Sequence, residues 1–143
     1  MQQATGNIWE YWNIGYWVVI TTNGFVKANG ECVMGRGTAK QAANRFPELP
    51  LAVGKQIREN GNKPFVFDTR RIITLPVKHN WWEPADLGLI SRSTVRLVNI
   101  VNLWGLERVA MPRPGCGNGQ LTWAAVERVI GPLLDERFTI VQL

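Results

Sequence analysis

Met111-Pro-Arg-Pro-Gly-Cys-Gly-Asn-Gly-Gln-Leu-Thr-Trp123 is the stretch around which the rest of the chain is organised. An apolar run leads into it, glycines stand at the alternate positions Gly115, Gly117 and Gly119, and a helical pattern of apolar residues begins near Thr122. A strand, a glycine loop and a helix start in this order point backbone N–H groups and a helix N-terminus at one spot, where an anion such as a diphosphate is stabilised. A tight strand-to-helix turn without a ligand is the alternative.

Length and composition limit the class of protein. The chain has 143 residues, 45% of them hydrophobic, which suits one domain with a sizeable core. We expect no membrane span, because no run of about 18 consecutive apolar residues occurs, and no secretion signal. Cys32 and Cys116 lack both metal-ligand spacing and a dense disulfide pattern, so we expect reduced thiols in a cytoplasmic protein without metal or cofactor. The net charge of +5 permits a polyanionic partner.

Apolar patterns and turn signals predict strands that alternate with helices, and therefore a layered α/β sheet in a single domain. Thr38 and Gln41 have the form of a capping box, which predicts a helix start at Thr38. The sequence predicts an edge strand within 1–15, followed by a turn at 13–15, and further strands at 16–22, 64–67, 71–77, 107–112 and 138–141, with a hairpin at 24–32. Helices are expected at 38–45, at 51–58, between Pro84 and Gly105, and at 122–130. The long helix between Pro84 and Gly105 has an apolar stripe of Leu87, Ile90, Leu97, Val101 and Trp104.

Ligand sites in such sheets lie in the loops that follow the carboxyl ends of strands. Four loops qualify, namely Asn23–Gly37, Lys78–Glu83, Arg113–Gln120 and Gly6–Ile8. Two of these loops, Asn23–Gly37 and Arg113–Gln120, are rich in glycine, and the loop Lys78–Glu83 holds a lysine beside two tryptophans. The sequence therefore predicts one site to which these loops contribute.

Familiar nucleotide motifs are incomplete in this chain. Gly30–Gly35 has the first half of a P-loop spacing, but Arg36-Gly37 replaces the lysine and the hydroxyl residue that a kinase or ATPase needs. Gly115–Gln120 misses the dinucleotide fingerprint, because its third glycine falls one place early. Two diphosphate-sized loops without catalytic metal ligands indicate a bound nucleotide whose phosphates are not the reacting groups.

Three motifs together resemble the macrodomain family: Val33-Met-Gly-Arg-Gly-Thr-Ala39, Leu75-Pro-Val-Lys-His79 and Pro112–Trp123. The similarity covers nearly the whole chain and is greatest to the branch that contains the DNA ADP-ribosyl glycohydrolases of toxin–antitoxin modules and the terminal ADP-ribose protein glycohydrolase. This resemblance implies a three-layer α/β/α sandwich with a mixed central sheet, and a cleft at the strand ends that binds ADP-ribose.

The resemblance also implies roles for individual residues. Asn7 stands where the family usually has an aspartate that accepts from the adenine amino group, and an asparagine oxygen can also accept, without the charge. Asn23 falls near the asparagine that faces the distal ribose. The implied ligand-binding residues are Asn7 and Ile8 at the adenine, Asn23 at the distal ribose, Met34, Gly35, Arg36 and Gly37 in the first phosphate loop, and Pro114, Gly115, Cys116, Gly117, Asn118 and Gly119 in the second.

Lys78 matches the lysine that this branch uses for catalysis at the anomeric carbon of the distal ribose. A lysine desolvated among aromatic residues has its neutral form favoured, which makes it nucleophilic. The protein glycohydrolase carries an acid where Gly119 stands, whereas the DNA-directed relatives have glycine there. We therefore expect a hydrolase that acts without metal, as a monomer, and removes ADP-ribose from DNA or, less favoured, from protein.

Simpler structural roles remain open for the same residues. A non-catalytic reader of ADP-ribose, a binder of NAD-derived metabolites and a phosphatase acting on ADP-ribose 1″-phosphate are the alternative functions. The alternative roles are a solvated loop lysine for Lys78, a packing role for His79, a seal of the sheet edge rather than a substrate contact for Trp81 and Trp82, a small buried residue for Cys116, core for Trp123, and either a phosphate contact or a strand cap for Arg113.

Overall fold

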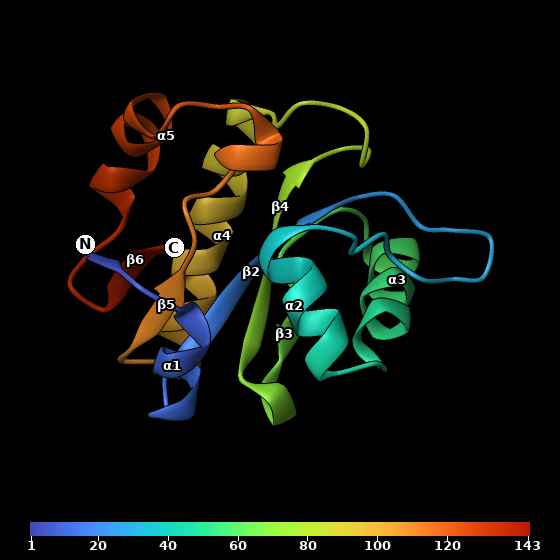
Figure 1. Cartoon of the computed structure of the whole chain (residues 1–143), viewed down its shortest axis with the longest axis horizontal. Helices are drawn as coiled ribbons and strands as arrows, with labels where there is room; N and C mark the ends of the chain where they lie inside the picture. The colour runs from blue at the N-terminus through green and yellow to red at the C-terminus, as the bar shows by residue number, and fades with distance from the viewer.

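Strand β2 (Trp17–Asn23) lies in the middle of a six-stranded sheet because its side chains are apolar on both faces. A computed structural model describes all 143 residues (Figure 1). The other strands are β1 (Gln2–Thr5), β3 (Val66–Phe67), β4 (Ile72–Lys78), β5 (Val109–Met111) and β6 (Phe138–Gln142), and the helices are α1 (Ile8–Asn13), α2 (Gly37–Arg45), α3 (Leu49–Asn60), α4 (Leu87–Trp104) and α5 (Trp123–Ile130).

The sheet order is β1-β6-β5-β2-β4-β3, and all neighbours are parallel except the antiparallel pair β3 and β4. The expected mixed sheet is therefore confirmed. Because five strands run the same way, their carboxyl ends meet at one edge of the sheet. The loops that leave this edge build the site described below.

Two separate cores cover the two faces of the sheet, which confirms the three-layer α/β/α architecture. Val19 faces a core formed with α4 and α5, whereas its neighbours Val18 and Ile20 face a core formed with α1, α2 and α3. This alternation follows from the two-residue period of a strand. Figure 1 shows the two groups of helices on either side of the sheet.

The segment after β1 differs from the prediction. The edge strand and the turn before Tyr16 are present, but residues 8–13 form α1, a helix that the prediction did not include. Asn7 is the N-cap of this helix, and its side-chain oxygen accepts from the N–H of Trp9 at 3.0 Å. Burial of Ile8 and Trp9 against the sheet then stabilises the short helix.

Residues 24–32 form the expected hairpin in a minimal form. One antiparallel bridge joins Val26 and Cys32, the N–H of Lys27 donates to the carbonyl of Glu31 at 2.8 Å, and the chain turns at 28–30. The hairpin also packs on α3. The N–H of Cys32 donates to the carbonyl of Pro50 at 2.9 Å. A Cβ atom at Gly54 would come within 1.9 Å of the carbonyl oxygen of Gly30, so the close approach of loop and helix requires glycine at this position.

Two predictions about helices were also wrong in detail. Helix α2 begins at Gly37, one residue before the expected start, and its N-cap Arg36 makes no side-chain capping bond. Thr38 lies inside the helix, where its hydroxyl accepts from the N–H of Thr21 at 3.4 Å and links α2 to β2. In α4, Trp104 is 47% exposed and packs beside Trp17 rather than in the core.

No helix combines the length and the apolar character needed to cross a bilayer.

Candidate functional site

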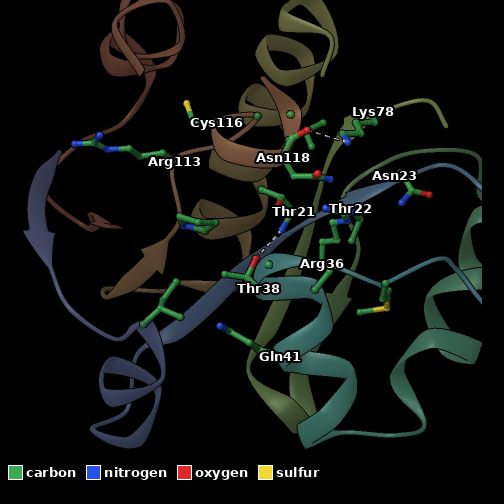
Figure 2. A pocket seen from close by; sticks show the side chains of 18 of the residues that line it. Thr21, Thr22, Asn23, Arg36, Thr38, Gln41, Lys78, Arg113, Cys116 and Asn118 are labelled. Atoms are coloured by element: carbon green, nitrogen blue, oxygen red, sulfur yellow. Dashed lines mark hydrogen bonds between the residues drawn. The ribbon is translucent and has the colours of Figure 1, made fainter. Parts of the chain in front are cut away.

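A cavity of about 490 Å³ opens at the carboxyl ends of the parallel strands. All four loops that the sequence singled out line it, from Gly6–Ile8, from the segment after β2, from the end of β4 and from the segment after β5 (Figure 2). Its volume lies within the range of about 300–1,000 Å³ that is typical of small-molecule sites. The four loops therefore form one ligand-sized site.

The first glycine loop lies at the N-terminus of α2. Gly35, Arg36 and Gly37 line the cavity and are exposed. The N-terminal N–H groups of α2 have no side-chain cap. A Cβ atom at Gly35 would meet no atom within 4 Å, so internal packing does not require glycine there. The open space beside uncapped N–H groups suits an anion.

The second glycine loop is fixed to the loop that follows β4. Gly119 accepts a hydrogen bond from the N–H of Ala85 at 3.0 Å. Cβ atoms at Gly119 and Gly115 would lie 2.9 and 3.0 Å from the Cβ of Ala85, and Gly115 also has a φ of +74°. Packing thus explains these two glycines without a ligand, while the whole loop still lines the cavity.

Lys78 stands at the carboxyl end of β4, beside the second glycine loop. Its side chain is buried, with the residue 8% exposed. The amine donates to the carbonyl oxygens of Trp81 at 3.4 Å and of Asn118 at 3.5 Å (Figure 2). No carboxylate lies within ion-pair distance of it. Burial, and then the positive charge of Arg36, lower the pKa of Lys78 below its ordinary value.

Hydrogen bonds to backbone carbonyls hold the segment around Lys78 in place. The side-chain Nδ2 of Asn62 donates to the carbonyl of Lys78 at 3.0 Å, and the N–H of Gly24 donates to the carbonyl of His79 at 3.1 Å. The N–H of Asp86 returns to the carbonyl of Val77 at 2.9 Å, which closes the loop between them. A positioned amine with a lowered pKa reaches its neutral, nucleophilic form more readily than a solvated lysine, which suits attack on an electrophilic carbon.

His79 is not among the residues that line the cavity. Its Nε2 lies 2.8 Å from a carboxylate oxygen of Asp86, the N-cap of α4. The hydrogen bond from His79 and those from the helix N–H groups lower the pKa of Asp86. This arrangement favours the packing role for His79 over an acid–base role.

The two tryptophans of the loop after β4 occupy different places. Trp81 lines the cavity, whereas Trp82 lies outside it. Their side chains are 51% and 59% exposed, and their rings meet edge to face at 5.5 Å. They do not seal the sheet edge.

Asn7 and Asn23, two of the asparagines assigned to the ligand by resemblance, line the cavity, but side-chain atoms of both already have partners. The oxygen of Asn7 caps α1, as described above. Asn23 donates to the carbonyl of Val33 at 2.9 Å and accepts from the N–H of Phe25 at 2.9 Å. In this structure Asn23 therefore holds the loop after β2 in place.

Cys116 lines the cavity from the second glycine loop. Burial raises the pKa of its thiol, and Arg113 only partly opposes this effect. A protonated thiol is a poor nucleophile. The buried Cys32, whose pKa burial raises to about 11, is also a free thiol.

Several lining residues were missed by sequence reasoning, and four assigned residues do not line the cavity. Thr21 and Thr22 at the end of the central strand could have been found from the strand-end rule, but Gln41, one turn into α2, had no signal of its own. Arg113, for which the sequence left a phosphate contact and a strand cap open, also lines the cavity, and its Nε is buried without a partner. Its guanidinium lies 5.1 Å from the ring centre of Trp123. Trp123 itself is half-buried and not part of the core. The assigned residues outside the lining are His79, Trp82, Pro114 and Gly117; the remaining unassigned lining residues are Gly6, Val33, Thr38, Ala39, Val77, Pro112, Val141 and Leu143.

Comparison with descriptions of known protein families finds no match. The chain is 34% identical over 105 residues to a DNA ADP-ribosyl glycohydrolase of Mycobacterium tuberculosis, a match that covers 67% of this chain and 30% of the relative. The chain thus spans about a third of the length of the curated relatives it matches.

Solved structures extend this similarity to the whole fold. The similarity to Thermosipho africanus DarTG in complex with ADP-ribose has a TM-score of 0.71 over 88% of this chain and 37% of that one. At 19% identity this similarity supports a shared fold and nothing more. The macrodomain of Mycobacterium tuberculosis DarG has a TM-score of 0.73 and 31% identity, over 88% of both chains. Since this relative matches in sequence and structure over nearly its full length, the chain belongs to the macrodomain family.

Proposed function

We propose that this macrodomain binds ADP-ribose and hydrolyses it from a modified macromolecule, with DNA as the favoured substrate and without a metal ion. The observation that carries the proposal is the position of Lys78. Its buried amine is held against the second glycine loop and has only backbone carbonyls as partners, while the charge of Arg36 in the first loop helps to lower its pKa. Two of the relatives named above support the choice of ligand, because one is a DNA ADP-ribosyl glycohydrolase and another was solved with ADP-ribose.

The proposed binding mode follows the roles that the resemblance implies for the residues that line the cavity. The diphosphate lies against the N-terminus of α2 at Gly35–Gly37 and against the loop Gly115–Gly119. The adenine lies toward Asn7 and Ile8, and the distal ribose toward Lys78. In this mode the positive end of the α2 dipole and the charge of Arg36 offset the charge of the diphosphate.

The proposed reaction has two steps. The neutral amine of Lys78 attacks C1″ of the distal ribose, and a C–N bond forms while the bond from C1″ to the macromolecule breaks. The electron pair of the broken bond leaves with the macromolecule, which takes up a proton from water. Water then attacks C1″ and displaces the amine, so that ADP-ribose and the unmodified macromolecule are released and Lys78 is restored.

The environment of Gly119 supports DNA over protein as substrate. The protein-directed branch carries an acid at this position, according to the resemblance described above. Here a Cβ atom would lie 2.9 Å from the Cβ of Ala85, so a side chain does not fit without displacing the loop after β4. The site therefore has no acid at this position, as in the DNA-directed branch.

Two measurements test the proposal. Titration calorimetry with ADP-ribose, ADP and NAD should show the tightest binding for ADP-ribose. The wild-type protein should release ADP-ribose from ADP-ribosylated single-stranded DNA, and Lys78→Ala should abolish this release while it leaves binding of free ADP-ribose nearly intact. Equal turnover by Lys78→Ala would exclude the lysine mechanism. Tight binding without turnover on DNA or protein substrates would select a non-catalytic reader.

A further inference from the structure

An exposed aromatic platform borders the cavity beside Lys78. It consists of Trp81 and Trp82, with Phe25 packed against Trp82 from the loop after β2. More than half of each tryptophan side chain is exposed. Two adjacent indoles exposed to this degree are unusual on a protein surface unless they contact a partner.

The platform is held from several sides. The ring of Trp82 meets those of Trp81 and Phe25 edge to face, each at a centroid distance of 5.5 Å. The carbonyl of Trp81 accepts from the Lys78 amine, and Gly24 binds the backbone of His79. A Cβ atom at Gly24 would lie 3.0 Å from the carbonyl oxygen of His79, so glycine permits this close approach. The loop after β2 and the loop after β4 thus together hold the exposed ring of Trp82 in place.

The platform lies where the rest of a bound substrate must continue. If the distal ribose lies at Lys78, its C1″ substituent leaves the cavity past the residues nearest to that amine. Trp81 lines the cavity and touches Lys78 through its carbonyl, and Trp82 lies next to it outside the cavity. The order from inside to outside is therefore amine, first indole, second indole.

We propose that Trp81 and Trp82 bind the bases of a single-stranded nucleic acid by stacking, with the modified nucleotide at Trp81 and a neighbouring base on Trp82. The inference rests on the proposed function and specifies its substrate. Indole faces stack on any base, and only an unpaired strand presents base faces. Lys78 and Arg36, which line the cavity, favour a polyanion, and Asp86 is paired with His79. Glu83, directly after Trp82, is the acidic residue that opposes them, and its Oε1 is buried.

The test measures binding in a Lys78→Met background, where turnover does not interfere and the thioether fills the space of the lysine stem. The ligands are free ADP-ribose and a single-stranded oligonucleotide with ADP-ribose on one base. Trp82→Ala should weaken binding of the modified oligonucleotide by about 5-fold or more, since a base stacked on an aromatic residue contributes at least about this factor. Binding of free ADP-ribose should not change.

Two further variants serve as controls. Trp82→Phe keeps an aromatic face and should restore part of the lost affinity. Trp104→Ala removes a similarly exposed tryptophan at the opposite end of the sheet and should have no effect on either ligand.

The outcomes separate the platform from the proposed function. Equal affinities of Trp82→Ala and its parent for the modified oligonucleotide would overturn the platform, as would an equal loss of affinity for an ADP-ribosylated peptide. Absence of ADP-ribose release by the protein with Lys78 intact would overturn the hydrolase proposal, while the binding measurements would still decide whether Trp82 contacts DNA.

Discussion

Replacement of Lys78 by methionine should separate catalysis from folding. Methionine keeps the length and the apolar stem of the side chain but removes the amine. Two hydrogen bonds are lost, at 3.4 and 3.5 Å, and because both are long we assign them about 0.5 kcal/mol each. A buried positive charge is also removed, which offsets this loss. We expect the free energy of unfolding to change by less than about 1 kcal/mol, a shift in Tm of under about 4 °C.

The effect on the reaction should be much larger. Without the amine no covalent step is possible, and the rate of ADP-ribose release should fall by at least about 100-fold, which corresponds to about 2.7 kcal/mol in the activation free energy. The assay is single-turnover release of ADP-ribose from a labelled, modified oligonucleotide, with calorimetry to verify that free ADP-ribose still binds. Lys55→Met on the exposed face of α3 is the matched control.

The pH dependence of stability supplies an independent readout of the same residue. The pKa of Lys78 is lower in the folded state than its ordinary value of 10.5. Below the folded pKa the charged amine destabilises the fold by the full amount, and between the folded pKa and 10.5 the free energy of unfolding rises with pH. In Lys78→Met this rise of the unfolding free energy with pH should be absent. Rapid release by a folded Lys78→Met protein would refute the assignment of the nucleophile, and a protein that fails to fold would refute the energetic reasoning.

Three other perturbations test separate parts of the structure. Gly35→Val should leave Tm unchanged, since its Cβ enters open space, but should weaken ADP-ribose binding about tenfold or more in calorimetry by filling the first phosphate loop; unchanged affinity would place the diphosphate elsewhere. Gly54→Ala drives a methyl group toward the carbonyl of Gly30 and should cost about 1–3 kcal/mol of stability, seen as a lower Tm in thermal unfolding, whereas an unchanged Tm would contradict the packing of loop 24–33 on α3. The rate of ADP-ribose release should rise with pH and reach half its maximum below pH 10.5, because burial favours the neutral amine of Lys78; a rate that falls over this range would argue against attack by a neutral amine.

The layered fold and the general position of the site were predictable from local patterns. A continuous run of β-branched and aromatic residues marked β2 as a buried central strand, and all four loops assigned to strand ends line one cavity. These predictions succeeded because strand burial and the direction of parallel strands follow from the sequence period and the order of elements.

Details that depend on non-local packing were not predictable. Helix α1 forms because Asn7 caps it and Trp9 is buried by the sheet, but a run of aromatic residues alone also suits a strand. The Thr38 hydroxyl binds the N–H of Thr21, a partner that no local motif indicates. The ring contact between Phe25 and Trp82 joins two loops far apart in sequence, so only the structure could show that Trp82 is braced.

The pairing of β1 with β6 has a consequence for how the chain acquires its binding site during synthesis. Gln2–Thr5 meets its partner strand only after Phe138–Gln142 has left the ribosome, and the N–H of Gly6, which lines the cavity, donates to the carbonyl of Gln142 at 2.8 Å. A nascent chain halted before β6 would lack this wall. Ligand recognition should therefore arise late in translation, after the central strands have already come together.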